Sequence, residues 1–240
     1  MKILSMSTAT SDLSVAIRQD GQLTFAKMEK NQRNHSVDLD PLIEEGLKET
    51  GLTLKAIDRF AVAIGPGSYT GLRVGLTTAK MLASILGKDL VGVSTLKALA
   101  LNCAGRNALV VAALDARNQN FFAGAYRGQE AVIEDGHYAL GDLLDQIKAL
   151  PDQEVIFTGS DFTKYADAIK EGLAGKQVSF AEGDDNLLQA GQVALLAEKA
   201  APIDPDQAVP NYLRRTQAEY DWQKKTGQAF EADSAYVEEV

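Results

Sequence analysis

The chain has 240 residues, 45% of them hydrophobic and 24% charged, which suffices for one large domain or two lobes of roughly 100 residues each. Its 33 acidic and 24 basic side chains give a net charge of −9, which disfavours direct RNA binding by this chain alone. A single cysteine excludes an internal disulfide framework, and the apolar runs are too short for a signal peptide or for a membrane helix of ~20 residues. We therefore expect a cytoplasmic protein without a membrane partner.

The first part of the chain predicts three strands followed by a helix, a strand, a helix and a strand. The first helix is expected to have its N-cap at Asp38 and to stop at Gly51, because the apolar residues between them recur on one helical face. Residues 60–64 are apolar without interruption, which is typical of a strand covered on both faces. The expected strands lie at residues 3–7, 13–17, 23–28, 60–64 and 90–93, and the helices lie at 38–51 and 72–86.

The same order of elements recurs in the second part of the chain. Strands are expected at residues 108–114, 121–126, 131–138 and 155–157, and helices at 140–150 and 162–173. Two copies of one order predict an α/β protein with the actin-like (ASKHA) two-lobed fold, which is built from duplicated ribonuclease-H-like lobes. Prolines predict an extended connector at residues 201–210. The expected division is a first lobe at 1–104, a second lobe at 105–215 and an acidic C-terminal tail at 216–240.

A glycine-rich turn at residues 65–71 lies between a buried strand and a helix. Free amides and the helix dipole at such a turn can cradle a phosphate, but the same glycines also allow tight packing of the strand against the helix. The spacing alone favours packing. A Walker A motif requires a lysine after the last glycine, and none follows Gly71. The dinucleotide fingerprint requires Gly-x-Gly-x-x-Gly, whereas the spacing here is Gly-x-Gly-x-x-x-Gly.

Residues 65–75 read Gly-Pro-Gly-Ser-Tyr-Thr-Gly-Leu-Arg-Val-Gly, which is very similar to the signature of the TsaB (YeaZ) family. Further motifs that resemble the family follow in the same order, at residues 3–9, 35–43, 92–100, 115–117 and 210–214. Together they cover most of residues 1–215. The resemblance implies a non-catalytic subunit that acts in tRNA threonylcarbamoyladenosine biosynthesis.

The resemblance also implies partners. In that family the subunit supports TsaD, together with the ATPase TsaE, in N6-threonylcarbamoylation of the adenosine next to the anticodon of tRNAs that read ANN codons. It is expected to form a heterodimer with TsaD, and a homodimer when TsaD is absent. The resemblance implies that ATP and magnesium are used by the assembled complex, while this chain alone is not expected to bind a cofactor.

Three positions lack the side chains that catalysis needs. By the resemblance, the two metal-binding histidines of the paralogue TsaD fall on Thr95 and Leu99 of this chain. Leucine cannot bind a metal and a lone threonine hydroxyl is a poor ligand, so we expect no metal and no catalytic residue. Ser7 stands where the family often has an aspartate, which weakens the case for ATP hydrolysis. A vestigial nucleotide site remains conceivable at Thr8, Gly65, Gly67 and Gly71.

Two further polar positions have alternative interpretations. Asp115 and Arg117 could face a phosphate or a partner across the cleft between the lobes, or could belong to a hairpin turn in which the aspartate bonds nearby amides. We favour the turn. His35 is most simply a polar residue before a helix, since the sequence shows no partner that would make it a general base.

The helix after the glycine-rich turn is apolar on two sides. One side suits the sheet, and the second stripe is covered either by the other helix of the lobe or by a partner. By the resemblance, this helix pair packs against the equivalent pair of TsaD or of a second copy. The expected interface residues are Leu39, Ile43, Leu47, Val74, Thr78, Met81 and Ile85.

A competing hypothesis is an enzyme in its own right. The actin-like fold would then serve a stand-alone ATP-dependent phosphotransferase, which binds and turns over Mg-ATP. A metallopeptidase is disfavoured because the two histidines, His35 and His137, are far apart in the sequence and no cysteine pair accompanies them.

Overall fold

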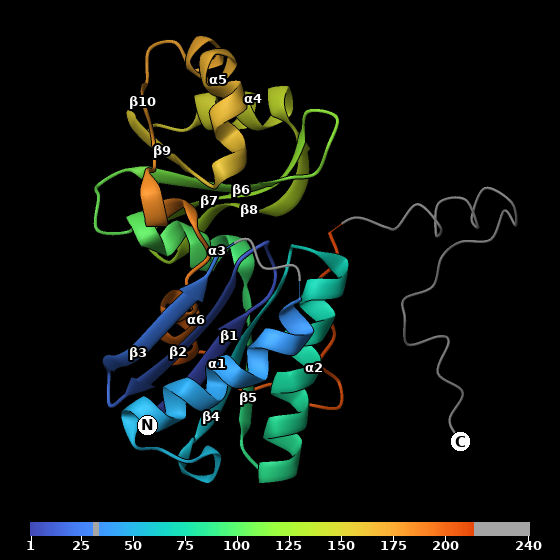
Figure 1. The fold of residues 1–240 in the computed structure, drawn as a ribbon. Coiled ribbons are helices and arrows are strands. Elements are labelled where there is room, and N and C mark those ends of the chain that lie inside the picture. The colour runs from blue at the N-terminus through green and yellow to red at the C-terminus, as the bar shows by residue number, and fades with distance from the viewer. Residues whose placement is uncertain (31–33, 214–240) are drawn as a thin grey trace, which may run out of the picture.

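The computed structural model describes residues 1–30 and 34–213 as two lobes, each with a five-stranded mixed sheet (Figure 1). The strands are β1 (Lys2–Ser7), β2 (Leu13–Gln19), β3 (Gln22–Glu29), β4 (Arg59–Gly65), β5 (Asp89–Ser94), β6 (Leu109–Asp115), β7 (Asn120–Arg127), β8 (Glu130–Ala139), β9 (Glu154–Thr158) and β10 (Gln177–Phe180).

The two sheets have the same topology. Their strand orders are β3-β2-β1-β4-β5 and β10-β9-β6-β7-β8, so the second order is the first one read backwards. In each sheet the first three strands along the chain are antiparallel, and the last two join in parallel. The predicted duplicated, actin-like α/β fold is therefore confirmed.

Two long helices lie side by side on one face of the first sheet: α1 (His35–Thr50) and α2 (Tyr69–Leu86) (Figure 1). The predicted start of α1 at Asp38 is wrong, because the helix begins at His35. Asp38 lies in the first turn, where its carboxylate interacts favourably with the helix dipole. The predicted stop is confirmed, since Gly51 is left-handed with φ 67° and its amide donates to carbonyls of the last turn.

The helices of the second lobe are α4 (Leu140–Ala149) and α5 (Ala166–Gly172). The single helix expected at residues 162–173 is divided into a 3₁₀ segment at Ser160–Tyr165 and the short α5. Phe162 anchors the 3₁₀ segment, because its ring packs against Phe121 and Phe157 with centroid distances of 5.0 Å and 4.8 Å. These three aromatic residues belong to the second lobe's own core.

The two lobes also share a hydrophobic core. The short helix α3 (Thr95–Ala100) lies between the two sheets, with Leu96, Ala98 and Leu99 buried. The same cluster contains Val91 of the first sheet and Val110 of the second. The lobes are therefore joined by packed apolar side chains as well as by the chain connection.

The end of the described chain returns to the first lobe. Helix α6 (Ala190–Ala197), which the sequence analysis did not predict, packs on β1 and β2. Residues 201–213, here called the strap, then follow β5 and α2. The expected division between the lobes at 104/105 stays a prediction. Helix α6 and the strap nevertheless lie against the first sheet: α6 covers the face opposite α1 and α2, and the strap borders the edge strand β5. The acidic tail at 216–240 lies outside the described residues.

Candidate functional site

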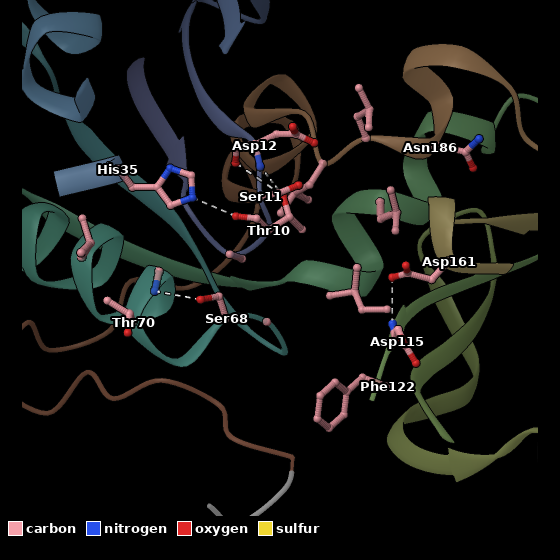
Figure 2. Close-up of a pocket in the computed structure, with 18 of the residues that line it drawn as sticks. Thr10, Ser11, Asp12, His35, Ser68, Thr70, Asp115, Phe122, Asp161 and Asn186 are labelled. Atoms are coloured by element: carbon pink, nitrogen blue, oxygen red, sulfur yellow. Dashed lines mark hydrogen bonds between the residues drawn. The ribbon is translucent and has the colours of Figure 1, made fainter. Parts of the chain in front are cut away.

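A cavity of about 570 Å³ lies between the two lobes (Figure 2). Its first-lobe wall comes from the β1–β2 turn, the start of α1 and the start of α2. Its second-lobe wall comes from the end of β6, from β7 and from the 3₁₀ segment after β9. In Figure 2, His35, Ser68 and Thr70 face Asp115 and Asp161 across this space. The lining residues are Ala9, Thr10, Ser11, Asp12, His35, Ser36, Gly67, Ser68, Thr70, Gly71, Val74, Leu99, Leu114, Asp115, Phe122, Asp161, Asn186, Leu187 and Leu188.

The glycine-rich turn is pressed against the β1–β2 turn. A Cβ added to Gly71 would overlap the Thr8 carbonyl oxygen, and a Cβ on Gly75 would lie 2.5 Å from Thr8 Oγ1. The Thr8 hydroxyl donates to the Gly71 carbonyl at 2.6 Å, and the Ser68 side chain caps α2 by accepting from the Gly71 amide at 3.3 Å. The glycines therefore allow close packing, in agreement with the interpretation that the spacing favoured.

The four residues expected for a vestigial nucleotide site divide into two pairs. Gly67 and Gly71 line the cavity, whereas Thr8 is 1% exposed and Gly65 is in contact with the strap at Asn211. The nucleotide role itself stays a prediction. Thr8 contributes to the site by holding the first turn of α2 in place.

The donor set between the lobes does not suit a catalytic metal. Thr95 is fully buried and its hydroxyl has no hydrogen-bond partner, while Leu99 lines the cavity with an apolar side chain. Ser7 is also fully buried, and its hydroxyl accepts from the Ala9 amide at 3.3 Å. Across residues 1–30 and 34–213, no group of three or more His, Cys, Asp or Glu side chains could hold a metal ion.

Asp115 has the hydrogen bonds of a turn residue and also lines the cavity. Its Oδ1 accepts from the Arg117 amide at 3.0 Å, and Arg117 adopts a left-handed φ of 68°. Its Oδ2 pairs with Lys164 Nζ at 2.9 Å, and its own amide donates to Asp161 Oδ2 at 2.9 Å. The hydrogen bond from Lys164 is the main reason why the pKa of Asp115 lies below its usual range, and the Arg117 amide adds to it.

His35 connects the start of α1 to the β1–β2 turn. Its Nε2 lies 2.9 Å from the carbonyl oxygen of Thr10, so this nitrogen carries the proton and donates. Its Nδ1 is buried without a hydrogen-bond partner. His35 is the first residue of α1, whereas the sequence analysis expected it to precede the helix. Its bond to Thr10 fixes one wall of the cavity.

The expected interface residues fall into three groups by burial. Leu39 and Ile43 are only 1% and 5% exposed and pack into the core under α1, although Leu39 also lines a groove between α1 and α2. A role of these two residues in an interface stays a prediction. Their side chains point to the sheet because they recur with the helical period on the inner face of α1. Leu47, Val74 and Thr78 are half-buried, whereas Met81 and Ile85 are exposed.

The sequence analysis missed Val37 in the first turn of α1 and Tyr69 at the start of α2. Val37 and Tyr69 are exposed at 66% and 45%, and a groove of about 520 Å³ runs between the first turns of the two helices. The signal for Tyr69 was present in the signature at residues 65–75, which was interpreted mainly through its glycines. We call this the α1–α2 groove; it is lined by Ser36, Leu39, Asp40, Tyr69, Thr70, Arg73, Val74, Thr77 and Thr78.

Comparisons with known proteins agree with this architecture. Residues 28–222 match the family model described as TsaD, tRNA N6-adenosine threonylcarbamoyltransferase. The chain is 30% identical to tRNA threonylcarbamoyladenosine biosynthesis protein TsaB of Bacillus subtilis, over 92% of this chain and 98% of that protein. The solved structure of YeaZ from Pseudomonas aeruginosa is 25% identical, with a TM-score of 0.71 over 88% of this chain and 100% of that one.

A more distant similarity concerns the fold alone. The ROK hexokinase from Thermus thermophilus is 12% identical, with a TM-score of 0.51 over 83% of this chain and 100% of that one. The two-lobed scaffold is thus shared with a sugar kinase. The motifs at residues 65–75 and 210–214, in contrast, resemble the TsaB family specifically. The chain belongs to the TsaB family, within the wider family that the threonylcarbamoyltransferase model describes.

Proposed function

We propose that the protein acts in tRNA threonylcarbamoyladenosine biosynthesis as a non-catalytic subunit that docks on a TsaD-family threonylcarbamoyltransferase. Membership of the TsaB family supports the role in this biosynthesis. The side chains at Thr95 and Leu99 support the lack of catalysis, because neither supplies a good metal ligand. The function of the chain would then reside in a contact surface.

The observation that carries this proposal is the exposed apolar stripe on α2. Met81 is 57% exposed and Ile85 is 76% exposed, one turn apart on the same helix. Burying such side chains is worth about 25 cal/mol per Å² of apolar surface, so a partner that covers them gains affinity. Methionine also adapts to different neighbours, which suits a face shared between TsaD and a second copy of this chain. We call the outward side of α2 with the α1–α2 groove the docking face.

The test is binding to the threonylcarbamoyltransferase of the same organism. Met81→Glu and Ile85→Glu are each expected to abolish co-purification while the far-ultraviolet circular dichroism stays unchanged. Leu23→Glu is the matched control, because Leu23 is 49% exposed on β3 and lies next to Gly191 of α6, on the opposite side of the sheet. Wild-type affinity in both α2 variants would overturn the docking face.

A stand-alone phosphotransferase is the competing function. None of the described residues lining the cavity is a lysine or arginine, so the site offers little to offset the charge of a polyphosphate. The carboxylates of Asp12, Asp115 and Asp161 add negative charge there. We propose that ATP and magnesium are used by the assembled complex. Calorimetric titration of the isolated chain with Mg-ATP, together with a phosphate-release assay, distinguishes the two: tight binding with steady turnover would favour the enzyme.

A further inference from the structure

The strap is fixed to the first lobe before it reaches the docking face. Near its start, the Ile203 amide donates to the Leu90 carbonyl of the edge strand β5 at 2.8 Å. In its middle, Lys80 Nζ of α2 donates to the Ala208 carbonyl at 3.0 Å. In Figure 1 the orange-red strap runs beside α2. These bonds place the strap along one flank of α2.

A third backbone bond fixes the end of the strap. The Asn211 amide donates to the carbonyl of Ile64, near the end of β4, at 2.7 Å. Gly65 leaves no room for a side chain here, because its Cβ would overlap the Asn211 carbonyl oxygen. The next residue, Tyr212, is thereby delivered to the first turn of α2.

Tyr212 closes a group of three side chains. Its ring stacks on Tyr69 with centroids 5.0 Å apart and planes inclined by 25°. Its hydroxyl accepts from Arg73 Nε at 2.9 Å, across 139 positions of sequence. The Arg73 guanidinium in turn lies 4.3 Å from the centre of the Tyr69 ring, so each of the three contacts the other two.

This group borders the surface assigned to the partner. Tyr69 and Arg73 line the α1–α2 groove, and Thr77 and Met81 continue from Arg73 at steps of four residues along the same side of α2. The outward face of α2 thus lies between α1 on one flank and the strap on the other. Tyr212 is half-buried, whereas Tyr69 and Arg73 are exposed.

We propose that Tyr212 is a positioning residue for the docking face, an inference that rests on the proposed function. Long and aromatic side chains that are free in the unbound protein lose rotamer freedom when a partner covers them, and this loss weakens binding. The Tyr212 ring and hydroxyl hold Tyr69 and Arg73 in one arrangement before the partner arrives. Tyr69 and Arg73 therefore lose their rotamer freedom when the chain folds, and this loss no longer weakens binding of the partner.

The test compares three variants in calorimetric binding to the threonylcarbamoyltransferase of the same organism. Tyr212→Ala is expected to raise Kd about tenfold, which corresponds to about 1.4 kcal/mol. Tyr212→Phe keeps the stack on Tyr69 and loses only the hydrogen bond from Arg73. Its Kd should stay within about threefold of the wild-type value, so the conservative change should rescue binding. Ile203→Ala keeps the amide bond to Leu90 but removes the side chain that lies beside Gly92 of β5, so it loosens the strap at its other end and should lower the Tm without changing Kd.

The possible outcomes separate this inference from the function on which it rests. An unchanged Kd for Tyr212→Ala, with binding still abolished by Met81→Glu, overturns the positioning role and leaves the docking face intact. An equal loss in Ile203→Ala and Tyr212→Ala also overturns it, because the effect would then be general loosening of the strap. No binding by the wild type, or full binding by Met81→Glu and Ile85→Glu, overturns the proposed function itself.

Discussion

The carboxylate of Asp135 in β8 accepts a hydrogen bond from the hydroxyl of Ser94 at the end of β5, and so connects the second lobe to the first. The Tyr126 hydroxyl donates to the other oxygen of the same carboxylate. Ser94 is also the N-cap of α3, where its Oγ accepts from the Lys97 amide at 3.0 Å. One half-buried acid is thus hydrogen-bonded to the residue that caps the helix between the lobes.

This carboxylate predicts a specific pH dependence of stability. Burial is the main reason why the pKa of Asp135 lies above its usual range; Glu134 raises it further, and Ser94, Tyr126 and Lys97 oppose the shift. Because the folded pKa exceeds the unfolded one, this group's contribution to stability is present below the unfolded value of about 4 and is lost as pH rises through the folded pKa.

We therefore expect the free energy of unfolding of the wild type to fall relative to that of Asp135→Asn as pH rises from about 4. Urea unfolding of both proteins across this range measures the difference. Tyr126→Phe is the control, because it removes a hydroxyl but keeps the titrating carboxyl. A difference between wild type and Asp135→Asn that does not change with pH would contradict the prediction.

The Lys164–Asp115 pair predicts an effect of the opposite sign. Since Lys164 lowers the pKa of Asp115, the contribution of this carboxylate to stability is present above its unfolded pKa and is lost as pH falls through the lowered value. Lys164→Ala should raise the pKa of Asp115, measured by carboxyl-carbon NMR titration. The cost in stability should be small, because both side chains of the pair are partly solvated. An unmoved Asp115 pKa would show that the salt bridge is not formed in solution.

Gly75 is expected to tolerate no side chain. Gly75→Ala places a methyl group 2.5 Å from Thr8 Oγ1 between α2 and the β1–β2 turn, and should destabilise the protein by roughly 1–3 kcal/mol. Gly141→Ala is the matched control in α4, where a Cβ meets nothing within 4 Å and alanine should stabilise by up to about 1 kcal/mol. Thermal unfolding followed by circular dichroism measures both. Equal Tm values would refute the close contact.

The shared core predicts that the lobes unfold together. Leu96 of α3 is fully buried between the two sheets, so Leu96→Ala should cost roughly 2–5 kcal/mol. Native-state hydrogen exchange should then show protection falling in both β4 and β6 to a similar extent. Loss of protection in one sheet only would mean that α3 belongs to that lobe alone.

The sequence predicted the parts of the fold that leave a local pattern. Alternating and unbroken apolar runs located nine of the ten strands found in the described residues, and the left-handed Gly51 stopped α1 as expected. Helix α6 was missed because its sequence, AGQVALLA, is apolar or small almost throughout and shows no helical period. The burial of Leu39 and Ile43 was missed for a related reason, since periodicity reveals a helix face but not which neighbour covers it.

The site was predictable only in fragments. The cavity is assembled from segments as distant as the β1–β2 turn and Asn186, and no local pattern records their proximity. The bond between Tyr212 and Arg73 joins two motifs that were each recognised in the sequence, but their contact depends on the path of the strap. Long-range geometry of this kind follows from the tertiary fold alone.

The strap also dictates the order in which the protein can be completed during synthesis. The edge of β5 and the second face of the first sheet are closed by α6 and by the bond of Ile203 to Leu90. Until those residues leave the ribosome, the oldest part of the nascent chain exposes an unpaired strand edge and an uncovered apolar face. The lobe that is translated first is therefore the one that is finished last.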